Sequence, residues 1–233
     1  MTALLEVDRL NAWYDASQVL HGVSLAINEG EIVALAGRNG SGRSTLAKAL
    51  MGVVRREGSV RFRGQSIIAL RPHVIARLGI GYVPEQRDVF PTLTVRENLL
   101  LGMKSRMSRF SIDDAQRLFP VLRERASVKA GALSGGEQQM LAIARTLVGD
   151  PSLVIVDEPT EGLAPQVVAQ VAACLTDLTQ RGVAILLIEQ RASVVRKLAT
   201  RVAVMGHGAI VFDGSPDALA ADDRVTNEWL SVG

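Results

Sequence analysis

The sequence predicts an α/β fold in which helices cover both faces of a mainly parallel sheet. Apolar runs of strand length alternate with helical patterns along the chain, and this order builds parallel sheets. The first such run, Ile32 to Ala36, is short and continuously apolar, as a strand buried on both faces would be. Hydrophobic residues make up 48% of the 233 residues but aromatic residues only 4%, so aliphatic side chains and alanine build the interior.

Three further elements can be placed in the first third of the chain. The segment "SLAINEGEIVALAG" holds two apolar stretches separated by a turn at residues 28–30. From Ser44 onward, apolar residues recur at helical spacing and stop at Gly52, which predicts a helix that ends there. The segment "EGSVRFRGQSI" alternates polar and apolar residues, so it predicts an antiparallel hairpin.

The rest of the chain divides into a helical insertion and three strand candidates. From residue 88 to about residue 125 the pattern is helical and polar, without a strand. We therefore expect one domain over residues 1–233, with a helical lobe at about 88–149 inserted into a core of about 1–87 and 150–233. The later strand candidates are "SLVIVDEP", "VAILLIE" and "RVAVMGHGAIVFDG".

Composition and charge argue against several classes of protein. There are 26 Lys and Arg against 24 Asp and Glu, and the arginines are interleaved with acids, so we predict a solvated surface and no nucleic-acid partner. Cys174 is the single cysteine, which excludes an internal disulfide, and its apolar setting predicts the buried side of a helix. We expect no signal peptide and no membrane-spanning helix, because no run of about 18 apolar residues occurs. Any role at a membrane would come through a partner.

The stretch "GRNGSGRST", residues 37–45, nearly matches a phosphate-binding loop, G-x-x-x-x-G-K-[ST], with Arg43 in place of the lysine. It follows a buried strand and opens a helix, so its backbone N–H groups can wrap a triphosphate, with the Ser44 hydroxyl on Mg²⁺. Alone, it fits a glycine-rich turn without a ligand equally well. The predicted nucleotide-binding residues in the stretch are Gly37, Asn39, Gly40, Ser41, Gly42, Arg43, Ser44 and Thr45.

Two acids follow a later apolar strand, "LVIVDEP", residues 153–159. Asp157 and Glu158 lie at its carboxyl end, where ligands bind in parallel sheets. We expect Asp157 to hold Mg²⁺, directly or through water, and Glu158 to act as general base on the attacking water. The pair could instead cap the following helix, and that alternative stays open at this point.

The segment "LSGGEQQMLAIARTLVGDP" carries the most specific pattern in the chain. Ser134 and Glu137 form a capping box, S-x-x-E, at the start of a predicted helix. Gly135 and Gly136 stand between them, although glycine costs about 1 kcal/mol in a helix, which implies that something approaches the first turn. The N–H groups and helix dipole make an anion site there, and the anion could be a γ-phosphate.

A phosphate loop, an LSGGE segment and an acid-ending strand, in that order, resemble the motifs of ATP-binding cassette (ABC) ATPases, and the resemblance runs from about Leu5 to the C-terminus. In that family two chains close head to tail around two ATP molecules, and LSGGE-type motifs contact the ATP held by the other subunit. The resemblance implies ATP and Mg²⁺ as cofactors and a P-loop NTPase core with an antiparallel β subdomain. Arg43, Asp157 and Glu158 would serve this chain's own site. The residues that would contact a partner's ATP are Ser134, Gly135, Gly136 and Glu137.

Three more site positions follow from the resemblance. Tyr14 resembles the aromatic residue that stacks on adenine, with Trp13 as a neighbouring alternative. Glu85 or Gln86 takes the magnesium-sensing position in the loop between core and lobe, and the sequence does not decide between them. Gln190 stands where many cassettes have the histidine that contacts the γ-phosphate, so we expect a catalytic role for it. A structural or solvent role is expected for His21, His73 and His207.

The segments "VPEQRDVFPTLTVRENL", "EGLAP" and "IEQ" together resemble one subfamily. It is the shorter of two ATPases in importers of branched-chain amino acids, with relatives in urea and short-amide importers. The resemblance implies a second ABC ATPase in a hetero- or homodimer, membrane permease subunits and, indirectly, an extracytoplasmic solute-binding protein. The chain would then be peripheral, at the cytoplasmic face of the membrane, with the lobe around Phe90 to Leu101 against the permease.

Arg43 leaves two hypotheses about activity. In the first, the chain is an active ATPase that powers uptake of branched-chain amino acids or a similar small polar solute, and arginine is a tolerated cation. The retained Ser44, Asp157 and Glu158 support this hypothesis. In the second, the chain is a degenerate, weakly hydrolytic module that completes the partner's site. A cassette protein of ribosomes or DNA repair is disfavoured, because those usually carry two fused cassettes or long insertions.

Overall fold

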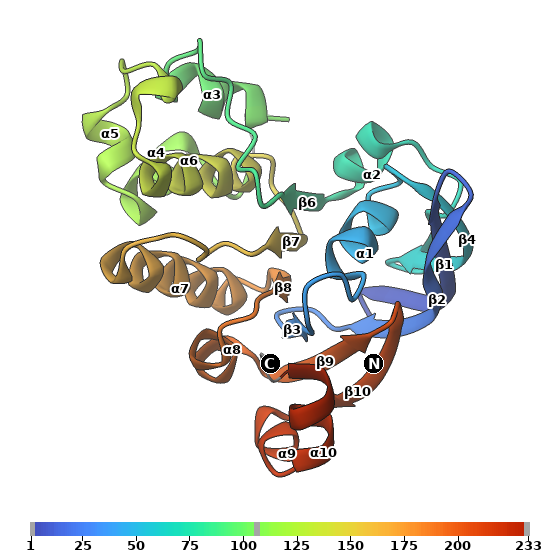
Figure 1. The fold of residues 1–233 in the computed structure, drawn as a ribbon. Helices are drawn as coiled ribbons and strands as arrows, with labels where there is room; N and C mark the ends of the chain where they lie inside the picture. Colours follow the sequence, from blue (N-terminus) through green and yellow to red (C-terminus); the bar gives the residue numbers. More distant parts are fainter. Residues whose placement is uncertain (1–2, 105–107, 231–233) are drawn as a thin grey trace.

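The computed structural model describes residues 3–104 and 108–230. In this part of the chain a six-stranded sheet lies beside a four-stranded one (Figure 1). Across the larger sheet run β10 (Ala209–Gly214), β9 (Arg201–Gly206), β3 (Ile32–Ala36), β8 (Ala184–Ile188), β7 (Leu153–Asp157) and β6 (Ile80–Val83). The predicted α/β class is confirmed.

The larger sheet is mainly parallel, as the sequence predicts. β3 pairs in parallel with β8 and β9, and β7 pairs in parallel with β6 and β8. Every residue of β3, β7 and β8 is buried, because helices or the second sheet cover both faces. The segment "RVAVMGHGAIVFDG", expected as one strand, forms two: His207 (φ 46°) and Gly208 (φ 78°) make a left-handed turn, so β10 folds back antiparallel to β9.

The second sheet is the predicted antiparallel subdomain. Its strands, in order, are β2 (Ser17–Ile27), β1 (Leu5–Tyr14), β4 (Arg55–Phe62) and β5 (Gln65–Ser66). The hairpin predicted in "EGSVRFRGQSI" is confirmed as β4 and β5, with Arg61 opposite Ser66. Arg63 (φ 52°) and Gly64 (φ 75°) are both left-handed and form its turn.

Between β6 and β7 the described chain is helical. The elements are α3 (Val95–Gly102), α4 (Ile112–Leu118), α5 (Val121–Glu124), a 3₁₀ turn (Ala130–Ala132) and α6 (Gly135–Leu147), gathered at one end of the larger sheet (Figure 1). Among the described residues of 88–125, extended pairing is limited to one bridge from Thr94 to Lys129. The expected helical character is confirmed, whereas the lobe boundaries near residues 88 and 149 stay a prediction.

The remaining helices pack on the two faces of the larger sheet. They are α1 (Arg43–Leu50), α2 (Pro72–Leu78), α7 (Pro165–Gln180), α8 (Ala192–Leu198), α9 (Pro216–Ala220), α10 (Asp223–Val225) and the helical segment Thr226–Leu230. Alternate residues of β7 divide between the faces: Leu153 and Ile155 join the core around α1, and Val154 and Val156 join the core around α6 and α7. This two-sided burial fixes the carboxyl ends of the strands, where the predicted site residues lie.

Two other expectations concern helices. Cys174 is buried in α7, as predicted, and burial raises the pKa of its thiol to about 12. No helix in residues 3–104 and 108–230 is long and apolar enough to cross a membrane.

Candidate nucleotide site

The phosphate loop lies between the carboxyl end of β3 and the amino end of α1. Gly42 (φ 106°) directly precedes α1. The backbone N–H groups in the first turn of this helix have no acceptor within the helix. At Gly37 (φ 150°) a Cβ atom would lie 2.5 Å from the carbonyl oxygen of Met205, so the loop passes too close to β9 for any side chain. A tight loop that presents helix N–H groups is a ready anion site.

A cavity of about 380 Å³ opens over this loop, and we call it the nucleotide cavity. The residues lining it are Val19, Asn39, Gly40, Ser41, Gly42, Arg43, Ser44, Thr45, Glu85, Glu158, Glu161 and Gln190. Segments far apart in the sequence therefore meet at one place, as the phosphate loop and the strand ends were expected to do. Gly37 and Tyr14 are not among the lining residues.

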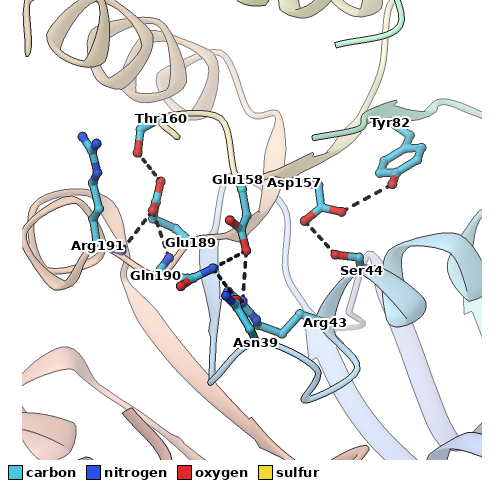
Figure 2. A network of polar contacts seen from close by, with 10 residues as sticks. All are labelled: Asn39, Arg43, Ser44, Tyr82, Asp157, Glu158, Thr160, Glu189, Gln190 and Arg191. Atoms are coloured by element: carbon cyan, nitrogen blue, oxygen red, sulfur yellow. Dashed lines mark hydrogen bonds and ion pairs between the residues drawn. The ribbon is translucent and has the colours of Figure 1, made fainter. Parts of the chain in front are cut away.

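Arg43 is buried and paired with the predicted general base. Its Nη2 lies 2.9 Å from Glu158 Oε1, and the two side chains are 5% and 12% exposed. The same Nη2 donates to Asn39 Oδ1 at 3.2 Å, as Figure 2 shows. Arg43 Nη1 and Ser41 Oγ are both buried without a hydrogen-bond partner among the described residues, which leaves two donors available to phosphate oxygens.

Gln190 completes this network from the end of β8. Its Nε2 donates at 2.7 Å both to Asn39 Oδ1 and to Glu158 Oε1 (Figure 2). Glu158 Oε1 therefore accepts hydrogen bonds from Arg43 and Gln190 together. Glu158 also has a left-handed backbone (φ 46°), a strained conformation that occurs often at functional sites.

Asp157 and Ser44 lie side by side next to this network. Ser44 Oγ donates to Asp157 Oδ1 at 3.2 Å, and the Tyr82 hydroxyl lies 3.5 Å from Asp157 Oδ2 (Figure 2). Burial raises the pKa of Asp157, repulsion from Glu158 and Glu85 adds to the rise, and the hydrogen bond from Ser44 opposes it. Burial and Asp157 also raise the pKa of Tyr82.

Carboxylates line the nucleotide cavity and could take part in binding a divalent cation together with a phosphate ligand. Repulsion from Glu158 raises the pKa of Glu161, so the carboxylates are close enough to repel one another. No cluster of three Asp, Glu, His or Cys side chains able to hold a metal occurs in the described chain. Mg²⁺ in proteins commonly keeps several waters and takes phosphate oxygens as ligands beside one or two carboxylates. Glu85 lines the cavity and Gln86 does not.

The LSGGE segment begins α6 away from the nucleotide cavity. The capping box is confirmed: Glu137 N–H donates to Ser134 Oγ at 3.3 Å, and Ser134 N–H donates to Glu137 Oε2 at 2.7 Å. The expected close approach to the glycines comes from the same chain. A Cβ at Gly135 would lie 2.6 Å from Arg87 Nη1, and one at Gly136 would lie 3.0 Å from Val167. Contact with a partner's ATP stays a prediction.

The two aromatic candidates differ in their surroundings. Tyr14, at the end of β1, is 41% exposed, with Lys48 Nζ 5.8 Å from its ring centre. Trp13 is partly buried, and the guanidinium of Arg55 lies 5.0 Å from its ring centre. Tyr14 is thus the more accessible of the two rings, although neither lines the nucleotide cavity. Of the histidines, His207 packs edge-on against the Trp229 ring at 5.2 Å, in line with a structural role.

Glu189 is a site residue that the motif analysis missed. It is 3% exposed, and its Oε2 accepts a 2.6 Å hydrogen bond from the Thr160 hydroxyl. Its Oε1 accepts from the backbone N–H groups of Gln190 and Arg191, each at 2.9 Å (Figure 2). Through these hydrogen bonds Glu189 connects the chain around Gln190 with Thr160, which follows Glu158 by two residues. A charged residue directly after the wholly apolar strand β8 was the signal that could have found it.

The sequence profile of the ABC transporter family matches residues 20–161. The chain belongs to this family. The matched segment includes the phosphate loop, the LSGGE helix and the acids at the end of β7.

Two named relatives match this ABC ATPase along nearly its whole length. The high-affinity branched-chain amino acid transport ATP-binding protein BraG of Pseudomonas aeruginosa is 40% identical over 231 residues, which cover 97% of this chain and 99% of that protein. The probable branched-chain amino acid transport ATP-binding protein LivF of Archaeoglobus fulgidus is 34% identical over 238 residues, which cover 99% of both. The sequence resemblance to the importer subfamily is confirmed.

A solved structure extends the likeness to the fold. The crystal structure of a nucleotide-free ATP-binding cassette from an ABC transporter matches 100% of both chains with a TM-score of 0.85 and 26% identity. The predicted ABC ATPase architecture is confirmed, and the chain is an ATP-binding ATPase subunit.

Proposed function

We propose that this ABC ATPase powers a membrane importer of branched-chain amino acids or a similar small polar solute. The observation that carries the proposal is the 40% identity to BraG over 97% of the chain. The nucleotide cavity supports it, because Ser44, Glu158 and Gln190 meet there. A degenerate module that only completes a partner's site is not favoured, since the relatives along the whole chain are ATP-binding transport subunits.

The loop and α1 hold the phosphates in this proposal. The N–H groups of the phosphate loop and the buried guanidinium of Arg43 supply positive charge, and Ser41 Oγ and Arg43 Nη1 are donors without other partners in the described chain. Gly37 acts by letting the loop pass close to β9. Tyr14, exposed at the end of β1, can offer its ring to adenine, for which aromatic stacking is suited.

Ser44 and Asp157 would hold Mg²⁺, the Ser44 hydroxyl directly and Asp157 directly or through water. Bound there with ATP, the ion would neutralise charge on the β- and γ-phosphates. Glu85, which lines the cavity, is the better candidate than Gln86 for the magnesium-sensing position. The raised pKa of Asp157 agrees with a buried carboxylate that lacks a full positive partner.

Glu158 is the proposed general base and Gln190 the residue that orients the reacting groups. In the structure Glu158 Oε1 accepts hydrogen bonds from both Arg43 and Gln190, so this oxygen is already engaged by two side chains. Activation of a water requires Arg43 to move from Glu158 toward phosphate oxygens, which offer it bidentate partners. The release of Glu158 would then accompany phosphate binding and expose the carboxylate to the attacking water.

The proposed partners follow from the relatives and the exposed surfaces. Ser134, Gly135, Gly136 and Glu137 would contact the ATP of a second ABC ATPase subunit, for which the exposed Ser134 is placed at the start of α6. Permease subunits would bind the surface formed by Phe90, Leu100 and Leu101, which are 49%, 48% and 57% exposed. The chain would thus lie at the cytoplasmic face of the membrane, and a solute-binding protein outside would act through the permease.

The test is ATP hydrolysis by the purified chain with its partner ATPase and permease, together with uptake of radiolabelled leucine and urea by the reconstituted complex. Glu158→Gln should lower hydrolysis at least a hundredfold and leave ATP binding intact, whereas Glu29→Gln, in an exposed turn, should change neither. Hydrolysis that survives Glu158→Gln would assign turnover to the partner. Uptake of neither solute would overturn the proposed substrate class.

A further inference from the structure

A second cavity lies at the opposite ends of the strands that carry the nucleotide site. It has a volume of about 350 Å³ and includes Gly79 and Ser152, which directly precede β6 and β7. Asp157 ends β7 at the nucleotide cavity, so the two cavities are separated by the length of a five-residue strand, roughly 16 Å. None of the predicted site residues lines this second cavity, which we call the basic cavity.

Cations from separate elements converge on the basic cavity. Arg63 comes from the turn between β4 and β5, Arg77 from the last turn of α2, and Lys104 from the segment after α3. Arg109 is the fourth cation, and Asp150 is the single acid among the lining residues. Arg109 Nε lies 2.7 Å from Asp150 Oδ1, so one positive charge is compensated and three are left over.

Neutral groups hold two of these cations in place. Arg63 Nη2 donates to Ser152 Oγ at 2.7 Å, and Lys104 Nζ donates to the carbonyl oxygen of Ala76. Hydroxyl and carbonyl acceptors orient the side chains but leave their charge uncompensated. Burial lowers the pKa of Lys104, as desolvation of an ammonium requires, although Asp150 opposes that change. Like charges brought together in one surface hollow repel one another, and a bound anion would relieve that repulsion.

We propose that the basic cavity binds a small soluble anion that carries phosphate groups with at least two negative charges. Guanidinium groups match phosphate oxygens in bidentate geometry, and a lysine adds a point charge. Three uncompensated cations suit a pyrophosphate-like group, and a cavity of about 350 Å³ has room for it. The ligand would bind independently of ATP, at the other end of the same buried strand.

The experiment titrates pyrophosphate into the full chain by isothermal calorimetry. The test variant is Arg77→Gln/Lys104→Gln, and the matched control is Arg61→Gln/Lys197→Gln, which removes the same charge from exposed positions elsewhere. We expect a binding event that is at least tenfold weaker in the test variant and unchanged in the control. The phosphate loop is intact in both, so any pyrophosphate that it binds contributes equally to the two titrations.

Equal affinity in test variant and control would overturn the proposal. Arg77→Gln alone provides a safeguard against misfolding, because the Arg77 side chain makes no ion pair or hydrogen bond with the described residues. This variant should weaken binding severalfold without changing the melting temperature. Binding of the chain to phosphatidylcholine vesicles, with and without phosphatidylglycerol, distinguishes a lipid headgroup from a soluble anion as the ligand. Vesicle binding that depends on Arg77 and Lys104, without pyrophosphate binding, would overturn a soluble ligand.

Discussion

At the scale of single residues, Arg43 decides how the resting site is arranged. A lysine ammonium is a compact charge, whereas the guanidinium is a planar fork with several donors, and here one nitrogen reaches both Glu158 and Asn39. The pair is nearly buried, and removing one partner of a buried ion pair leaves an uncompensated charge that typically costs 3–5 kcal/mol, about a third of the stability of many domains. The arginine therefore stabilises the ligand-free site in addition to any part in catalysis.

Arg43→Ala should lower kcat for ATP hydrolysis by roughly a hundredfold or more, because it removes positive charge from the transferring phosphate and leaves Glu158 buried without its cation. Arg43→Lys should stay within about tenfold of the wild type, since the charge is kept. Steady-state hydrolysis of the three proteins checks this, with Arg61→Ala, at an exposed position, as the control. A large gain in Arg43→Lys would instead mark the arginine as an inhibitory substitution.

Glu189→Gln tests whether this buried carboxylate positions Gln190. The change replaces charge-assisted bonds to the Gln190 and Arg191 N–H groups by weaker ones, so the free energy of unfolding should fall by about 2 kcal/mol and kcat by about tenfold. Urea unfolding and hydrolysis assays measure the two effects. Lower stability with unchanged kcat would show a structural role alone, and comparison with Gln190→Ala shows whether both variants affect the same step.

The sequence identified most residues of the nucleotide cavity but not their mutual contacts. Motif spacing placed Ser44 in the loop and helix that follow one strand and Glu158 directly after another strand, and parallel pairing then had to bring them together. It could not reveal that Arg43 pairs with Glu158, because the two are 115 positions apart and the contact depends on side-chain conformation. Glu189 lies within the segment "IEQ", but its part in the site was missed because it depends on contacts with backbone N–H groups and with the Thr160 hydroxyl, which the pattern does not reveal.

At the scale of elements, capping boxes set the starts of the lobe helices α3, α4 and α6. The Ser111 hydroxyl and backbone N–H hold the pKa of Asp114 at about 2, below its ordinary value of 3.8. Since the folded-state pKa is lowered, the charge of Asp114 stabilises the protein above about pH 4, and this contribution is lost as the pH falls toward 2. The start of α4 is thus a place where helix stability depends on acid pH.

Asp114→Asn should reduce the free energy of unfolding by about 1 kcal/mol at pH 7, and its difference from the wild type should shrink between pH 4 and pH 2. Thermal unfolding at several pH values checks both statements. Asp113→Asn is the matched control. The Asp113 carboxylate neighbours Asp114 in the sequence, but it is 77% exposed and takes no part in the capping box. An equal, pH-independent loss of unfolding free energy in both variants would contradict a stabilising role of the Asp114 charge.

Element prediction succeeded where one local pattern decided the structure. The box at Ser134 was found from S-x-x-E, and the same kind of box begins α3 at Thr94 and α4 at Ser111. The break between β9 and β10 was missed, because an apolar run on both sides hid the turn at His207 and Gly208. Neither residue pair Asn-Gly nor Asp-Gly is present there to signal a tight hairpin.

At the scale of the whole molecule, Leu101→Glu tests the proposed permease surface. A charge at this exposed position should leave ATP binding and folding unchanged but reduce solute uptake by the assembled transporter at least tenfold, because the apolar contact is lost. Val53→Glu, at a site 59% exposed outside the lobe, is the matched control. Uptake equal to that of the wild type would place the permease elsewhere.

The overall architecture followed from the order of apolar runs, but the basic cavity did not. Arg77 lies in α2, whereas Arg63, Lys104 and Arg109 lie in connecting segments, and each is an ordinary surface cation in the sequence. Only packing against the α6–β7 connection brings the β4–β5 turn, α2 and the described residues between α3 and α4 to one hollow. Charge arrangements of this kind depend on three-dimensional contacts, which sequence periodicity does not encode.

The burial of Cys174 makes the chain a convenient substrate for site-directed labelling. A thiol that is 2% exposed, with its pKa raised to about 12, has almost no thiolate to react with maleimides at neutral pH. A cysteine introduced at an exposed position, such as Lys197 or Leu101, would then be the single reactive sulfur without removal of the native one. Fluorophores or spin labels placed there could follow subunit closure during ATP turnover in otherwise unmodified protein.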